Sequence, residues 1–102
     1  MRSLLFIVSI LSVFVACSAK QITLYQFPFC PFCAKVRTAL DEQGVDYDIV
    51  NVPQSRSDEL RVYLYKQSGV YTVPVLRVQD DETDNWIGDS GNIIRQLGAG
   101  VF

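Results

Sequence analysis

Residues 21–43 read QITLYQFPFCPFCAKVRTALDEQ, and this stretch decides the fold. Its first six residues alternate polar and apolar side chains, a pattern that is typical of a half-buried β-strand. Residues 27–29 interrupt the alternation, and a helix is predicted over residues 31–43. Pro31 suits the first helical position, because the N–H that proline lacks has no helical partner there. The stretch therefore predicts a strand, a turn that carries the first of two cysteines, and a helix.

The segment that follows predicts a second strand and a second helix. Apolar side chains indicate a strand over residues 45–52. Ser55 is expected to cap the helix, with Asp58 in its first turn. The helix is expected to end at Gly69, where glycine provides a stop. The side chains expected to share one face of this helix are Leu60, Tyr63, Leu64 and Gln67.

The last part of the chain adds two strands and a helix. The strands are predicted over residues 74–79 and 85–87, with an acidic turn between them, and Asp89 is expected to cap the helix. A right-handed βαβ crossover would make the first two strands parallel, and the tight turn would make the last two antiparallel. We therefore expect an α/β fold in the order β-α-β-α-β-β-α, with helices packed on a four-stranded mixed sheet.

Length, charge and composition limit the function. The 102 residues, of which 49% are hydrophobic, suffice for one small domain, which we assign to residues 20–102. The formal net charge of −2 gives no indication of a nucleic-acid partner. The chain has no histidine. This excludes Ser-His-Asp and Cys-His hydrolase arrangements, and zinc sites with histidine ligands.

Residues 1–19 are expected to be an export signal. A basic start is followed by an apolar run over residues 4–16 and then by small residues. The run has about thirteen residues, short of the roughly 20 that span a bilayer. Cleavage after Ala19 and lipidation of Cys17, in a segment that resembles a bacterial lipobox, stay open as processing routes. A membrane anchor and a buried strand are further alternatives. We expect an exported protein that is periplasmic, secreted or membrane-associated.

Cys30 and Cys33 form a C-x-x-C pair that follows a strand and opens a helix, which is the pattern of a redox motif. The unpaired N–H groups and the dipole of the helix would lower the pKa of Cys30 and favour its thiolate. Cys33, one turn inside, would stay protonated and could resolve a mixed disulfide. A static disulfide and an iron–sulfur cluster shared between two chains are the alternatives. The third cysteine, Cys17, lies in the export segment, so we expect no metal site within one chain.

Residues 22–97 resemble a glutaredoxin, and are also similar to the N-terminal half of glutathione transferases. Residues 22–37 resemble the opening strand, active site and helix of the family. Thr72-Val73-Pro74 resembles its Thr-Val-Pro loop, and Gly88-Asp89-Ser90 resembles the segment that binds the γ-glutamyl end of glutathione. The resemblance implies a thioredoxin-like, three-layer fold of glutaredoxin size. It also implies glutathione as co-substrate.

The same resemblance assigns roles to the glutathione site. The Val73-Pro74 bond would be cis, and the backbone of Val73 would pair with the cysteine part of glutathione. Asp89 would supply charge to its α-amino group, and Ser90 would help hold its carboxylate. Many glutaredoxins have lysine three residues before the first cysteine, where this chain has Phe27, and Gln54 or Arg56 are candidates to compensate.

We therefore expect a monomeric, glutathione-linked thiol–disulfide oxidoreductase. It would reduce disulfides or protein–glutathione mixed disulfides through Cys30 and Cys33, so its partners would be glutathione and disulfide-bearing proteins. The first alternative is a module that binds glutathione or an iron–sulfur cluster with little turnover. The second is a membrane-side redox partner of one dedicated protein.

Overall fold

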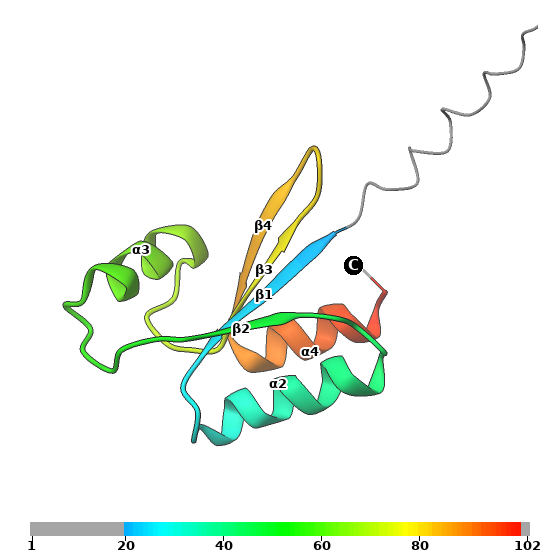
Figure 1. The fold of residues 1–102 in the computed structure, drawn as a ribbon, viewed down its shortest axis with the longest axis horizontal. Coiled ribbons are helices and arrows are strands. Elements are labelled where there is room, and N and C mark those ends of the chain that lie inside the picture. Colours follow the sequence, from blue (N-terminus) through cyan, green and yellow to red (C-terminus); the bar gives the residue numbers. More distant parts are fainter. Residues whose placement is uncertain (1–19, 101–102) are drawn as a thin grey trace, which may run out of the picture.

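The computed structural model describes residues 20–100 (Figure 1). The elements, in chain order, are β1 (Gln21–Gln26), α2 (Pro31–Glu42), β2 (Asp48–Asn51), α3 (Glu59–Ser68), β3 (Val75–Gln79), β4 (Asp84–Gly88) and α4 (Ser90–Gly98). The strands form one sheet in the order β2-β1-β3-β4. β1 and β2 are parallel, and the other two pairs are antiparallel. The predicted mixed sheet and element order are confirmed. The predicted export signal lies outside the described residues.

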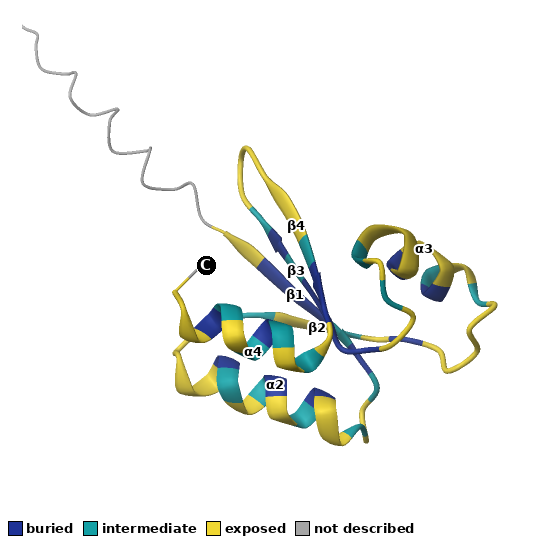
Figure 2. Cartoon of the chain, turned by 180° about the vertical axis from the view of Figure 1, so that it is seen from behind, coloured by how far each residue is buried: buried dark blue, intermediate teal, exposed yellow. Residues whose placement is uncertain are grey.

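The three helices divide between the two faces of the sheet, which gives the three predicted layers. α2 and α4 lie side by side across one face, and α3 lies on the other (Figure 1). Residues on β1 alternate accordingly: Ile22 and Leu24 pack with α2 and α4, whereas Tyr25 packs on the α3 side. Figure 2 shows buried residues along β1 and β3 and exposed residues at the tip of the β3–β4 hairpin.

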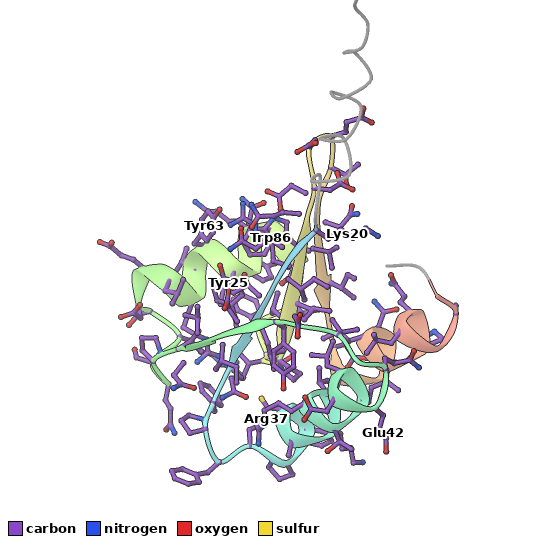
Figure 3. All side chains as sticks on the ribbon, turned by 45° about the vertical axis from the view of Figure 1, so that its right-hand side comes forward. Lys20, Tyr25, Arg37, Glu42, Tyr63 and Trp86 are labelled. Atoms are coloured by element: carbon purple, nitrogen blue, oxygen red, sulfur yellow. The ribbon has the colours of Figure 1, made fainter. Side chains whose placement is uncertain are left out.

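Aromatic rings extend the core on the α3 side. The ring of Tyr25 stacks on Trp86 with centroids 5.7 Å apart, and Tyr63 meets Trp86 edge-on at 5.5 Å. Figure 3 shows these three side chains gathered between the sheet and α3. Such pairs add to the free energy of burial. They fasten the short helix α3 to β1 and β4.

The second strand is shorter than predicted. The backbone N–H of Val45 donates to the carbonyl oxygen of Leu40 at 3.0 Å, so this residue closes the end of α2 instead of pairing with β1. Pairing begins where Thr23 opposes Asp48. The prediction assigned Val45 to the strand because it is apolar. Val45 does pack against the core, but it lies in the turn that follows α2.

The start of α3 also differs from the prediction. Asp58, not Ser55, is the N-cap, and its carboxylate accepts a hydrogen bond from the N–H of Leu60 at 2.9 Å. Ser55 instead shares a hydrogen bond with Ser57. Asp58 and Ser55 are both good caps by type. The local sequence could not decide between them. No helix within residues 20–100 is long and apolar enough to cross a membrane.

Candidate active site

Cys30 is the N-cap of α2, at the end of the turn that follows β1. Its backbone is extended, with φ −98° and ψ 123°, and Pro31 opens the helix. The Cys30 carbonyl accepts the first helical hydrogen bond, from Ala34 at 3.0 Å. The N–H of Cys33 donates to Sγ of Cys30 at 3.4 Å. The sulfur of Cys30 therefore lies where the helix presents unpaired N–H groups and the positive end of its dipole.

These surroundings favour the thiolate of Cys30. Burial opposes its negative charge, but hydrogen bonds from the Cys33 side chain and from the N–H groups of Cys33 and Phe32, with the charge of Arg37, hold its pKa below the usual value. Cys30 is half-buried, in contrast to the buried Cys33. Phe29 beside it is 98% exposed. A thiolate-prone sulfur at a half-buried position can act as a nucleophile.

Cys33 has the opposite environment. It is fully buried, inside the first turn of α2. Burial and its hydrogen bond to Cys30 raise its pKa to about 11. Both cysteines are free thiols in the structure. The pair thus combines one thiolate-prone sulfur with one sulfur that keeps its proton.

The Val73-Pro74 loop packs against the cysteines. Its peptide bond is cis, which confirms the predicted geometry. Val73 is buried in the same apolar cluster as Cys33, and Cys30 packs against that cluster. Pro74 is fully buried. Three of the predicted glutathione-site and catalytic positions, Cys30, Cys33 and Val73, are therefore brought together.

Asp89 and Ser90 lie at the start of α4. Val75 on β3 pairs with Gly88 on β4, and the two strands are antiparallel. Pro74, which precedes Val75, and Asp89, which follows Gly88, therefore lie at the same end of this strand pair. Asp89 caps α4, as predicted: its carboxylate accepts a hydrogen bond from the N–H of Asn92 at 3.2 Å. It is exposed and has a positive φ of 72°, a region that aspartate adopts more readily than most residues. Its carboxylate is available to an incoming cation.

Arg61 is a buried residue that the sequence analysis missed. It is only 6% exposed, on the face of α3 that Leu64 also occupies. Its guanidinium donates to the carbonyls of Pro53 at 3.0 Å, Gln54 at 2.8 Å and Tyr71 at 2.9 Å. The only available signal was its spacing of three residues from Leu64, which places both on one helix face.

Arg61 also bears on the residues near Cys30. Its Cζ atom lies 5.1 Å from the ring centroid of Phe27, the residue that stands where many glutaredoxins have lysine. The predicted alternative, Arg56, has its Cζ atom 6.0 Å from the ring centroid of Tyr71. Gln54 contributes its backbone carbonyl to Arg61. A buried cation is thus present beside Phe27, although it comes from α3.

Within the described part of the chain, no group of three or more histidine, cysteine, aspartate or glutamate side chains is arranged to hold a metal ion. The reactive groups of this site are the two sulfur atoms. A thiolate at a helix N-terminus can attack a disulfide, and a second thiol three residues later can displace the product.

Comparisons with known proteins show the family and the fold of the chain. A family model described as Glutaredoxin matches residues 22–82. The chain is 38% identical over 80 residues to mouse prostaglandin E synthase 2. This alignment covers 78% of the chain but 20% of that protein. It is 30% identical over 59 residues to glutaredoxin 1 of Rickettsia felis, and this alignment covers 58% of each protein. The chain thus spans about a fifth to about three fifths of these relatives.

Solved structures share the fold. The chain matches glutathione transferase Omega 2S of Trametes versicolor with a TM-score of 0.62 at 22% identity, over 82% of this chain and 39% of that one. It matches a rice glutathione transferase in complex with glutathione with a TM-score of 0.65 at 22% identity, over 78% and 32%. The match of the family model covers more than half of the sequence and includes both cysteines. The chain therefore belongs to the glutaredoxin family.

Proposed function

We propose that this chain is a dithiol glutaredoxin that reduces disulfides, and protein–glutathione mixed disulfides in particular. The observation that carries the proposal is the contrast between Cys30, a half-buried N-cap thiol with a lowered pKa, and Cys33, a buried thiol with a pKa of about 11. A nucleophile must be ionised before the reaction, whereas a resolving thiol must not compete for the substrate.

The proposed reaction is two thiol–disulfide exchanges. The Cys30 thiolate attacks the glutathione sulfur of the mixed disulfide, the S–S bond breaks, and the protein leaves as a thiolate that takes a proton. The Cys30–glutathione disulfide then reacts with a second glutathione thiolate, which releases oxidised glutathione and restores Cys30. Alternatively, Cys33 loses its proton and attacks Cys30, which releases glutathione and forms the Cys30–Cys33 disulfide.

The electrostatics favour the glutathione route for the second exchange. Burial is the main cause that raises the pKa of Cys33, and the hydrogen bond to Cys30 and its charge raise it further. The charge disappears once Cys30 is in a disulfide, but burial remains. The Cys33 thiolate is therefore scarce at neutral pH, and free glutathione competes well with it.

The Val73 backbone and the start of α4 are proposed to hold glutathione. Val73 packs in the cluster that contains Cys33, so a peptide that pairs with its backbone as an added strand would bring its sulfur near Cys30. The carboxylate of Asp89 would attract the α-amino group, and Ser90, at the first position of α4, would present its N–H to the carboxylate. These contacts would orient the glutathione sulfur of the mixed disulfide for attack by the Cys30 thiolate.

The role of Asp89 can be separated from its role as a cap. We expect Asp89→Asn to leave the melting temperature nearly unchanged, because asparagine caps helices as well as aspartate and tolerates a positive φ. Its KM for glutathione should rise about three- to tenfold, because a charged hydrogen bond is lost. Ser55→Ala is the matched control outside the site. An unchanged KM in Asp89→Asn would contradict the proposed anchor.

The function itself is tested on the wild-type protein with a glutathionylated peptide, glutathione and a coupled reductase. We expect release of the free peptide thiol at a rate that depends on both the enzyme and glutathione. Absence of turnover would reject the proposed enzyme, and a brown colour in the purified protein would favour the cluster-binding alternative. Prostaglandin E formation is assayed alongside, because the 38% identity to mouse prostaglandin E synthase 2 makes that activity the second candidate.

We also propose that residues 1–19 export the domain, which then acts as a monomer on disulfide-bearing proteins outside the cytoplasm. The mass of the native protein tests this. A free N-terminus at Lys20 would support simple cleavage. Loss of residues 1–16 with a lipid mass on Cys17 would support membrane association through a lipid. An intact Met1 would contradict both routes.

A further inference from the structure

Three polar side chains form a chain of hydrogen bonds between the sheet and α2. Gln26 ends β1 and is only 4% exposed, on the face where β1 otherwise presents apolar side chains to α2. Its Nε2 donates to Oδ1 of Asn51, its register partner on β2, at 2.9 Å. Nη1 of Arg37, on α2, donates to Oε1 of Gln26. A buried amide in an apolar layer is costly unless both of its ends are paired, as they are here.

The chemistry of the three groups sets the direction of this chain. A guanidinium has only donors, so the oxygen of the Gln26 amide must face Arg37. The NH₂ group of Gln26 then faces Asn51, whose amide must present its oxygen. Turning either amide over would place donor against donor. Asn51 therefore fixes Gln26, and Gln26 in turn fixes the position of the guanidinium.

The charge of Arg37 acts on both cysteines. Arg37 follows Cys33 by one helical turn, a spacing that puts both residues on the same side of α2. Its positive charge adds to the hydrogen bonds that hold the pKa of Cys30 down against burial, and it opposes the burial that raises the pKa of Cys33.

Other charged groups on the neighbouring elements contact aromatic rings, backbone carbonyls or other side chains. Nζ of Lys35, also on α2, lies 5.8 Å from the ring centroid of Phe32. Arg61 on α3 donates to backbone carbonyls. Asp41, near the other end of α2, accepts a hydrogen bond from Tyr47. Arg37 is the cation whose charge is among the causes that lower the pKa of Cys30.

We propose that Gln26 is a positioning residue: held by Asn51, it keeps the guanidinium of Arg37 beside the dithiol, where the positive charge stabilises the reactive sulfur of Cys30. The inference rests on the proposed redox function. It assigns to Arg37 the electrostatic part of that function, and to Gln26 and Asn51 the task of holding it in place. The device fits a chain whose residue three positions before Cys30 is the uncharged Phe27.

The test is the titration of Cys30 in the reduced, full domain, followed by the ultraviolet absorbance of the thiolate. Cys33 does not interfere near neutral pH, because its pKa is about 11. We expect Arg37→Gln and Gln26→Leu each to raise the pKa of Cys30. The rate of alkylation of Cys30 at slightly acidic pH should fall about two- to fivefold, as for a partly exposed charge pair. Asn51→Ala, at an exposed position, should shift the pKa in the same direction and serves if Gln26→Leu folds poorly.

A double variant and a control make the test specific. If Gln26 acts through Arg37, Gln26→Leu should cause no further change in an Arg37→Gln background. Lys35→Gln removes an equal charge from α2 and should leave the titration unchanged. The proposal is overturned if Gln26→Leu and Asn51→Ala titrate like wild type, or if the effect of Gln26→Leu persists in full without Arg37. The titration needs no substrate. If the protein showed no glutathione-linked turnover, the proposed function would be rejected, but the titration would still test the role of Gln26.

Discussion

Cys30→Ser is expected to abolish disulfide exchange, whereas Cys33→Ser keeps a measurable rate toward glutathionylated substrates. Cys30 caps α2 and has the lowered pKa, and a serine hydroxyl in its place stays protonated and is a poor nucleophile toward sulfur. The loss should be roughly 10³-fold or more, as is usual when a nucleophile is removed. Cys33→Ser removes only the resolving thiol, so glutathione can still complete the cycle. Equal activities of the two variants in the mixed-disulfide assay would reject this assignment.

The same contrast predicts how the thiols respond to pH. The lowered pKa of Cys30 means that its thiolate persists as the pH falls below the usual range of a thiol, while Cys33, with a pKa of about 11, stays protonated through neutrality. Of Cys30 and Cys33, brief treatment with iodoacetamide at neutral pH should therefore label only Cys30, as peptide mass mapping would show. A second label should appear on Cys33 only after unfolding, because that thiol is fully buried.

The sequence was sufficient where local signals decide the structure. The alternation in residues 21–26, the spacing of Cys30 and Cys33, and the turn residues between the strands each specify their own segment. These signals therefore predicted the order of the elements and the position of Cys30 at the N-terminus of α2. Asp89 was predicted as a cap because a capping side chain acts on N–H groups only two or three residues away.

Features that depend on distant partners were not predictable in this way. Arg61 is held by carbonyls seven to ten residues away, so nothing in its own neighbourhood indicates that it is buried. Gln26 reads as the polar end of an alternating strand, and only the parallel register with β2 shows that it meets Asn51. Local sequence patterns therefore say least about polar residues that face the core. The role of such residues is visible only in the three-dimensional contacts.

Arg61→Leu is expected to cost about 2–4 kcal/mol of folding free energy, because hydrogen bonds from a charged donor to buried acceptors are among the stronger ones. For a domain of this size, the melting temperature should fall by roughly 10–30 °C. The guanidinium joins the loop after β2, at Pro53 and Gln54, to the loop before Val73, at Tyr71. Leucine would fill the apolar space but leave those carbonyls without a donor.

Two variants show whether the tie between the loops, and not the charge alone, matters. Arg61→Lys keeps the charge but lacks the planar fork that reaches three carbonyls at once, so thermal unfolding should show most of the same loss. Arg56→Leu removes an exposed arginine from the same region and should change the stability by no more than about 0.5 kcal/mol. If Arg61→Lys melts like wild type, one charge contact suffices and the fork is unnecessary. If it melts early and also binds glutathione more weakly, Arg61 holds the Val73 loop in the position that the active site requires.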